Sequence, residues 1–206
     1  MTSGYPVVSS RTVHEGPIFS VAVDQVRMPS GEVRQRDVVH HPGAVGIVAI
    51  DGPDGQERVL LIRQYRHPVR APLLELPAGL LDLDGEPASV AAARELAEEA
   101  GVAAARWDVL IDAFSSSGMS DEAVRIFLAR DVRPAPDTGF EPADEEADLA
   151  PRWLHLTHAI DQVVAGEITN ALCVMGLLAA ARSRDSGWSG LRPVDAPWPG
   201  RPDHAG

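Results

Sequence analysis

The sequence of 206 residues has little cysteine and shows no internal repeat. A single cysteine excludes a framework of disulfide bonds within the chain, and Cys173 lies in an apolar helical run, where a buried structural thiol is expected. No signal peptide and no apolar run long enough to cross a membrane is present. We therefore expect a cytoplasmic protein without a membrane partner.

Positive charge is also scarce. Lys and Arg number 18 against 30 Asp and Glu, which gives a net charge of −12. This balance argues against nucleic acid as a partner, but not against a phosphate substrate, because bound divalent cations can reverse the local field. With 45% hydrophobic residues the chain can bury one good-sized core and a small second lobe.

The stretch at 76–102, LPAGLLDLDGEPASVAAARELAEEAGV, organises the rest of the chain. Proline after Gly85-Glu86 and glycine at 101 predict a helix over Pro87–Ala100. At about 100° per residue, Glu95, Glu98 and Glu99 share one face of this helix. Like charges so close repel unless a cation lies between them, and hard oxygen ligands suit Mg²⁺ or Mn²⁺. The alternative is a solvated acidic helix face.

The run RELAEEAGV at 94–102, with Glu86 eight residues before Arg94, resembles the Nudix box, G-x5-E-x7-R-E-U-x-E-E-x-G-U, where U is aliphatic. Every fixed position from Glu86 onward matches. Gly79 departs from the pattern because it lies seven residues before Glu86 instead of six. We expect the loop Leu80–Asp84 to absorb the additional residue, since loops tolerate insertions.

Strand patterns occur before and after the box, and the first ten or so residues are expected to be a loose terminus. Two strands are predicted to form an N-terminal hairpin, and further strands and two helices follow the box. The predicted strands are Pro17–Met28, Val33–His40, Ala44–Ile50, Val59–Tyr65, Leu73–Leu76, Trp107–Phe114, Ala123–Ala129 and Pro151–Leu156, and the helices are Thr157–Glu167 and Asn170–Arg182.

The resulting fold class is α/β, a Nudix-type α/β/α sandwich with a mixed sheet and an N-terminal strand-rich extension. The expected domains are a β-rich extension at 1–42, a hydrolase domain at 43–182 and an irregular tail at 183–206. Trp188 and Trp198 indicate that part of this tail packs.

Over 13–180 the flanking sequence resembles the ADP-ribose pyrophosphatase branch of the family. The resemblance rests on the extension and on HPGAVGIVAI at 41–50, QYRHP at 64–68, ELPAGLLD at 75–82 and SGMSDE at 117–122. The branch usually has proline where this chain has Ser117, a departure that bears on the substrate and not on the fold.

The same resemblance implies which residues hold the substrate. Arg36 and Arg66 match positions that bind the substrate phosphates, and the two-pronged guanidinium of arginine suits phosphate oxygens geometrically. The alternative for each is a solvated surface arginine. Glu75 in the ELPAGLLD run is assigned to the same substrate site. The extension, with Arg36 and Phe19, is expected to complete the substrate site of a second subunit in a homodimer.

By resemblance, the metal ligands are the Ala78 carbonyl, Glu95 and Glu99, with Glu98 in support. Arg94 is expected to pair with a box carboxylate and orient it. Glu86 either assists the metal or favours the positive end of the helix dipole.

The resemblance to this branch also implies that the base that deprotonates the attacking water comes from the acidic run at 144–148, with Glu146 as the first choice and Glu145 in reserve. The alternative for this run is a solvated series of charges.

Three functions fit these residues. The first is a Mg²⁺-dependent (or Mn²⁺-dependent) hydrolase that cleaves ADP-ribose to AMP and ribose 5-phosphate. The second is a Nudix hydrolase of another nucleoside diphosphate derivative, such as a nucleotide sugar or a dinucleotide. The third is a non-catalytic nucleotide sensor. The complete box argues against the sensor, which has no need of three carboxylates ready for metal.

Overall fold

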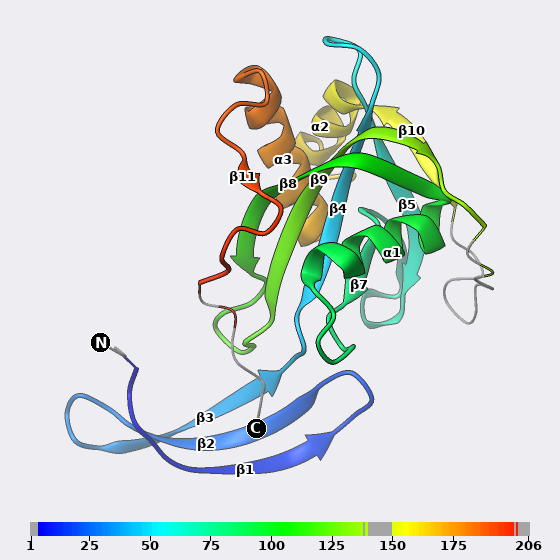
Figure 1. The fold of residues 1–206 in the computed structure, drawn as a ribbon. Helices are drawn as coiled ribbons and strands as arrows, with labels where there is room; N and C mark the ends of the chain where they lie inside the picture. The colour runs from blue at the N-terminus through cyan, green and yellow to red at the C-terminus, as the bar shows by residue number, and fades with distance from the viewer. Residues whose placement is uncertain (1–3, 138, 140–149, 200, 202–206) are drawn as a thin grey trace. The chain divides into compact units, whose positions relative to one another are not determined.

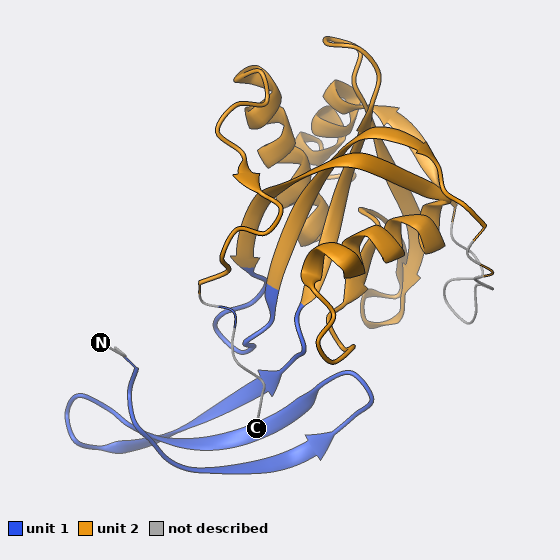
Figure 2. Cartoon of the chain, viewed as in Figure 1, with its two compact units in different colours: residues 1–43, 114–123, 200–206 blue, residues 44–113, 124–199 orange. Residues whose placement is uncertain are grey.

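The computed structural model describes residues 4–137, 139, 150–199 and 201, and these form two compact units (Figure 2). The N-terminal unit holds described residues of 1–43 and 114–123, together with Arg201. The main unit holds described residues of 44–113 and 124–199.

Three antiparallel strands in the order β1-β2-β3 make up the sheet of the N-terminal unit: β1 (Val7–Glu15), β2 (Ser20–Arg27) and β3 (Val33–His40). The two strands predicted for the hairpin, Pro17–Met28 and Val33–His40, are confirmed as β2 and β3. The expectation of a loose terminus was wrong, because residues 7–15 form β1. All nine residues of β1 are exposed. The sequence of this strand therefore lacks the alternation of buried and exposed residues by which a strand is predicted. The strand forms because it pairs with β2.

The loop at 115–122 is fastened to the end of β3 within the N-terminal unit. The Val39 amide donates to the Met119 carbonyl at 2.8 Å, and the Asp121 amide donates to the Val39 carbonyl at 3.1 Å. Asp121 also accepts a hydrogen bond from the His41 amide at 2.9 Å, and its other carboxylate oxygen lies 2.6 Å from His40 Nδ1. The loop thus groups with β3, although most of β8 and β9, which it connects, belongs to the main unit.

A mixed sheet of eight strands forms the middle layer of the main unit, with the path β10-β5-β4-β9-β8-β11. Its strands are β4 (Ala44–Asp51), β5 (Arg58–Arg66), β6 (Ala71–Glu75), β7 (Ala78–Leu80), β8 (Val102–Phe114), β9 (Ala123–Pro134), β10 (Arg152–His155) and β11 (Arg192–Pro193), with a 3₁₀ turn at His67–Val69. Helix α1 (Ala88–Ala100) covers one face, and α2 (Leu156–Val164) and α3 (Ala171–Asp185) cover the other (Figure 1). The predicted α/β/α sandwich is confirmed.

The sheet opens between β4 and β5. These strands pair only at Ile50 with Val59 and at Asp51 with Arg58. Toward its other end β4 pairs instead with β7, and β5 pairs with β6. The short connection between β6 and β7 therefore enters the opening, and the Ile47 amide holds it through a hydrogen bond of 2.9 Å to the Pro77 carbonyl.

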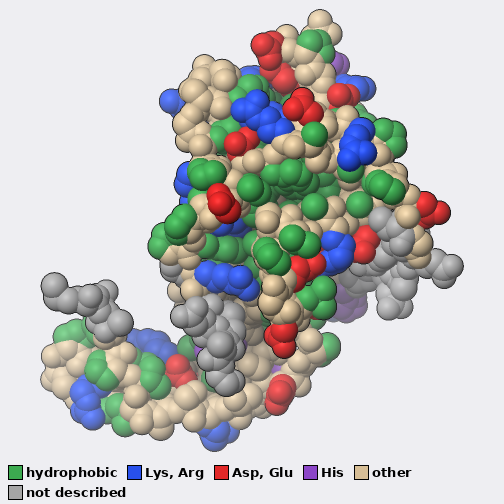
Figure 3. Space-filling view, in the orientation of Figure 1, with side chains coloured by type: hydrophobic (Ala, Val, Ile, Leu, Met, Phe, Trp, Pro, Cys, Tyr) green, Lys and Arg blue, Asp and Glu red, His purple; other side chains and the backbone are tan. Residues whose placement is uncertain are grey.

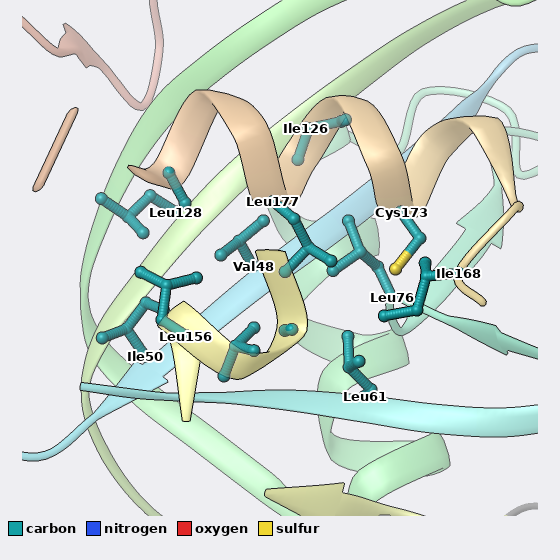
Figure 4. Close-up of a cluster of buried hydrophobic side chains, with 13 residues drawn as sticks. Val48, Ile50, Leu61, Leu76, Ile126, Leu128, Leu156, Ile168, Cys173 and Leu177 are labelled. Carbon is teal, nitrogen blue, oxygen red and sulfur yellow. The ribbon is translucent and has the colours of Figure 1, made fainter. Parts of the chain in front are cut away.

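Two apolar clusters fill the space between the layers. The cluster beneath α2 and α3, shown in Figure 4, includes Leu76, Ile126 and Cys173. Gly176 lets α3 approach the sheet, because a β-carbon there would come within 2.6 Å of the Leu76 side chain. The expected buried thiol is confirmed: burial raises the pKa of Cys173 to about 12, and the nearby charge of Glu75 adds to this effect.

The second apolar cluster lies beneath α1. It is built around buried side chains of the central strands and of α1, among them Val45, Ile47, Leu60, Ala91, Ala92, Leu96 and Phe127.

The described residues after α3 contain a short strand that the sequence did not predict. Arg192 and Pro193 form β11, which pairs with β8 at Val109 and Asp108. Trp188 packs against the cluster beneath α3, and Trp198 packs against the cluster beneath α1, as the sequence indicated. Within the described residues, none of the helices has the length and apolar character needed to cross a membrane.

Candidate active site

Helix α1 carries the acidic run, and its ends follow from the local sequence. Pro87 occupies the position just before the first helical residue, with ψ of 140°, so the helix begins one residue later than predicted. Gly101 ends it in the left-handed conformation, at φ of 64°, and its amide donates to the Ala97 carbonyl. Glycine adopts this conformation without the steric cost that a β-carbon brings.

One face of α1 is apolar and buried, and the other carries the acidic residues. Ala91, Ala92 and Leu96 are fully buried in the core, and the acidic residues lie on the other side. Only 15% of the Glu95 side chain and 21% of the Glu98 side chain are exposed, and Glu99 is 8% exposed. The alternative of a solvated acidic helix face therefore does not apply to α1, because these three carboxylates are mostly covered by other groups of the protein.

Glu99 joins α1 to the opening in the sheet. Its Oε2 accepts a hydrogen bond of 2.9 Å from the Ala78 amide, at the start of β7. A carboxylate with little exposure needs such donors to compensate for lost hydration. The bond places the backbone of the β6–β7 connection directly against the acidic face.

Gly79 faces Glu95, and a side chain there would not fit. A β-carbon built on Gly79 would overlap the Glu95 carboxylate. Glycine at this position therefore allows the backbone to approach the acidic face closely.

Arg94 bridges three carboxylates. Its guanidinium donates to both oxygens of Glu86 at 3.2 Å, to Glu95 at 2.7 Å and to Glu98 at 3.0 Å. The hydrogen bonds to Glu86 contribute most to raising the pKa of Arg94 above its ordinary value; burial opposes this, and Glu95 and Glu98 reinforce it. The predicted pairing of Arg94 with box carboxylates is present.

A second arginine–carboxylate pair lies on β5 and β6. Arg66 donates to both oxygens of Glu75, with the shortest distance 2.7 Å, and the carboxylate is almost fully buried. The Arg66 side chain remains 39% exposed. Glu75 thus holds Arg66 in place, while part of the Arg66 side chain stays exposed.

A sequence-family model described as NUDIX domain matches residues 40–171, which is more than half of the chain and includes the whole acidic helix. The chain belongs to the Nudix family. A second model, described as Nucleoside diphosphate sugar hydrolase N-terminal domain, matches residues 6–39 of this Nudix protein. The boundary between the two matches falls at the end of β3.

Two curated relatives are similar over most of their length. An ADP-ribose pyrophosphatase of Mycobacterium tuberculosis is 43% identical over 96% of this chain and 93% of its own. An ADP-ribose pyrophosphatase of Bacillus subtilis is 31% identical over 80% of this chain and 85% of its own. A solved structure described as an ADP compounds hydrolase superposes with a TM-score of 0.75 over 90% of this chain and 96% of that chain, at 24% identity. That structure supports the Nudix fold.

Nudix hydrolases generally use a divalent metal ion. In the part of the chain that the structure describes, no group of three or more His, Cys, Asp or Glu side chains is arranged so that it could hold a metal ion by itself. The donors nonetheless fit a hard cation, because Glu95, Glu98 and Glu99 offer oxygen only and Gly79 leaves the backbone close to them. Mg²⁺ commonly takes a few carboxylates and completes its coordination with water and substrate phosphate. Arg94 provides the positive charge in the present arrangement.

Arg36 and Phe19 lie in the N-terminal unit. Arg36 is on β3, where its guanidinium donates to the Gln35 carbonyl at 2.7 Å. Phe19 is 43% exposed and lines an open pocket of about 270 Å³ together with Glu15, Gly16, Ile18, Ser20, His40, His41 and Pro42. The pocket combines an aromatic ring with polar groups.

Glu145 and Glu146 lie outside the described residues, so both remain predictions from sequence. The contact between His40 and Asp121 was not anticipated, because the two residues are 81 positions apart and no local pattern links His40 to the SGMSDE run that contains Asp121. On the face shown in Figure 3, the described basic and acidic side chains are scattered among apolar ones and form no continuous basic area.

Proposed function

We propose that this Nudix hydrolase cleaves ADP-ribose to AMP and ribose 5-phosphate in the cytoplasm, with Mg²⁺ as the metal ion and Mn²⁺ as a substitute. The observation that carries the proposal is the acidic face of α1: Glu95 and Glu99 lie against the β6–β7 backbone, and Glu98 accepts a hydrogen bond from Arg94. The similarity to two pyrophosphatases named for ADP-ribose supports the substrate.

The metal would be held by the Ala78 carbonyl, Glu95 and Glu99, with Glu98 in support. When bound, the ion would neutralise phosphate oxygens and lower the pKa of a coordinated water. Arg94 orients Glu95 and Glu98 by donating one hydrogen bond to each. Its further bonds to Glu86 fix the guanidinium between the helix and the loop before it.

Glu146 would remove the proton from the attacking water, with Glu145 as the alternative. The acidic loop at 137–148 carries six carboxylates and no basic residue, so its carboxylates lack a neutralising neighbour in sequence. Water then adds to one phosphorus atom, the bridging P–O bond breaks, and the two products each leave with a phosphate.

Arg66 would bind the diphosphate, and Arg36 and Phe19 of a second subunit would help to complete the same substrate site. Glu75 contributes by holding Arg66, because a bidentate carboxylate leaves the arginine fork with one orientation. Each role is inferred from the resemblance together with these contacts.

We also propose a homodimer formed through the N-terminal unit. The three-stranded sheet exposes the apolar side chains of Val7, Val8 and Val13, and its β1–β2 connection exposes Ile18 and Phe19. A sheet of this size cannot cover them alone. A second subunit would cover part of this surface and share its substrate site. Light scattering at micromolar concentration would give twice the monomer mass; a fully active monomer would contradict the arrangement.

The second candidate is hydrolysis of another nucleoside diphosphate derivative. The match of residues 6–39 to a model described for nucleoside diphosphate sugar hydrolases favours it, and so does Ser117 in place of the usual proline. A third outcome, a nucleotide sensor without activity, would leave the complete acidic face unused.

Product analysis separates these functions. ADP-ribose, GDP-mannose, NADH and diadenosine polyphosphates would each be incubated with the full chain and Mg²⁺, then with Mn²⁺, and finally with a chelator. We expect the highest kcat/KM on ADP-ribose and no turnover after chelation. A higher kcat/KM on another compound would transfer the function to the second candidate, and no turnover on any compound would favour the sensor.

A further inference from the structure

The chain after α3 crosses the edge of the sheet and touches both apolar clusters. We call residues 188–198 the C-terminal strap. Trp188 and Leu191 pack against the cluster beneath α2 and α3. The strap then pairs with β8 as the terminal strand β11, and Val194, Ala196 and Trp198 pack against the cluster beneath α1. Figure 1 shows this orange-to-red segment beside β8.

Two arginines of β9 anchor the strap on opposite faces of the sheet. Successive side chains of a strand point to opposite faces, so Arg125 shares a face with Phe127, and Arg130 shares the other with Leu128. The Arg125 guanidinium lies over the Trp198 ring, 4.6 Å from its centroid. Arg130 lies over Trp188 at 5.3 Å.

Arg125 is the more completely enclosed of the two. Its side chain is 5% exposed, and it donates to both oxygens of Asp112, with the shorter bond 2.7 Å. It also donates to two strap carbonyls, those of Ala196 at 2.8 Å and Pro197 at 3.1 Å. A buried cation with this many acceptors cannot release the strap without losing several charge-assisted bonds.

Asp112 completes the anchor from β8. It accepts a further hydrogen bond of 2.7 Å from Arg192 of the strap. Burial alone would raise the pKa of Asp112, but hydrogen bonds and charge from Arg125 and Arg192 lower it below its ordinary value. The carboxylate therefore stays ionised and keeps both arginines in place at neutral pH.

The face on which Trp198 packs also supports α1. Ala91, Ala92 and Leu96, the buried side of the acidic helix, belong to the same apolar cluster as Trp198. Close-packed interiors transmit the loss of a large side chain to their neighbours, so the strap influences how α1 lies on the sheet.

We infer that the C-terminal strap, closed by Trp198 and Arg125, positions α1 and thereby the carboxylates that hold the metal. The metal role of those carboxylates rests on the proposed function. Trp198 and Arg125 are positioning residues, and they act through the apolar side of α1.

Trp198→Ala in the full chain tests the inference, with Trp188→Ala as the matched control. Both changes remove one strap tryptophan from beneath one arginine, but on opposite faces of the sheet. Three quantities would be measured: Tm, the Kd for Mn²⁺ alone by titration calorimetry, and hydrogen exchange of the α1 amides. We expect both variants to lower Tm.

Only Trp198→Ala should weaken Mn²⁺ binding, by about the 10- to 100-fold that loss of a supporting partner costs a metal site, and only it should speed exchange in α1. Equal changes in both variants, or an unchanged Mn²⁺ Kd in Trp198→Ala, would overturn the inference and leave the strap a stabilising element alone.

Two milder changes cover the case in which Trp198→Ala fails to fold. Trp198→Phe keeps an aromatic ring over Arg125 and should restore Mn²⁺ binding to within about threefold of wild type. Arg125→Lys keeps the charge but loses the fork, so it should weaken Mn²⁺ binding in the direction expected for Trp198→Ala. Wild-type binding by Arg125→Lys, together with unchanged α1 exchange, would refute the inference.

The exchange measurement also separates this inference from the proposed function. If the wild-type chain bound no Mn²⁺, the metal role of the acidic face would fail, but exchange in α1 would still decide whether Trp198 positions the helix. If wild type bound Mn²⁺ and Trp198→Ala did so equally well, only the inference about the strap would fail.

Discussion

Two clusters of charge in the main unit combine arginine with carboxylates in opposite proportions. On α1, one arginine, Arg94, is shared by three carboxylates. At the strap, two arginines, Arg125 and Arg192, share the single carboxylate of Asp112. The first cluster retains excess negative charge, whereas the second supplements its acceptors with backbone carbonyls and is covered by Trp198.

The difference separates a site that can accept a ligand from one that holds the fold together. Excess carboxylate in the first cluster leaves acceptor capacity for a divalent cation. In the second cluster, the guanidinium of Arg125 also donates to backbone carbonyls of the strap, so the protein itself supplies the additional acceptors. Charged residues with limited exposure are thus not sufficient to mark a functional site; the balance of donors and acceptors distinguishes the two cases.

The largest effect on catalysis is expected in the acidic run at 137–148, where the carboxylates have no basic neighbour in sequence. Glu146→Gln removes the proposed base and should lower kcat by about 10²- to 10⁴-fold, with little change in KM because this residue does not bind the ground state. The loss should shrink as pH rises, since hydroxide replaces the base. Steady-state kinetics over a pH series would check this.

Glu141→Gln, in the same acidic run at 137–148, is the control for Glu146→Gln and should leave kcat near the wild-type value. If Glu145→Gln loses activity and Glu146→Gln does not, Glu145 is the base. If neither matters, the loop is a solvated acidic run and the residues of α1 position the water.

A smaller effect is expected within the acid-rich cluster. Glu99→Gln removes one anionic ligand but keeps the size of the side chain, so kcat should fall by about 10- to 100-fold and the Mg²⁺ concentration for half-maximal rate should rise. A Mg²⁺ titration measures both. Glu167→Gln, an exposed carboxylate bonded only weakly to Gln162 at 3.2 Å, should change neither quantity. An unaltered metal requirement in Glu99→Gln would exclude Glu99 as a ligand.

The smallest effect concerns the strap cluster and appears in stability. Asp112→Asn should lower the free energy of unfolding by about 1–3 kcal/mol at neutral pH, because two arginines lose a charged acceptor. The pKa of Asp112 is lower in the folded chain than in the unfolded chain. The stabilisation is therefore present above the unfolded pKa of about 3.9 and is lost as pH falls through the folded value.

Urea unfolding of wild type and Asp112→Asn across this pH range would test the sign. The difference between the two proteins should shrink toward acid. Asp185→Asn is the control, because its ion pair with Arg184 leaves the Asp185 side chain 64% exposed and such pairs contribute little. A difference that stays constant with pH would show that Asp112 acts by packing and not by charge.

Local signals predicted the acidic helix well. Its predicted span of Pro87–Ala100 differs from α1 by one residue, because proline and glycine mark the two ends through backbone constraints that act within a few residues. The direction of Glu95, Glu98 and Glu99 follows from helix period alone. Arg94 could be paired with its neighbours for the same reason, since Glu98 lies one turn away.

Elements whose partners are distant in sequence were not predictable in the same way. β7 has only three residues, too few for a period, and it exists because β4 pairs with it where β5 diverges. β1 has no buried face. The bonds from Arg125 to the strap join residues 71 and 72 positions apart, which no local pattern reports.

The sequence by itself determined the acidic helix, its ends, its ligand-bearing face and the alternation of strands that yields a mixed sheet. These features depend on backbone geometry and side-chain period within a single element. Only the tertiary structure decided three contacts. Glu99 accepts a hydrogen bond from the Ala78 amide, Glu75 pairs with Arg66, and Trp198 of the strap packs against Arg125. Those contacts form because burial leaves each charge in need of a partner, and the partner is whichever group the fold brings within reach.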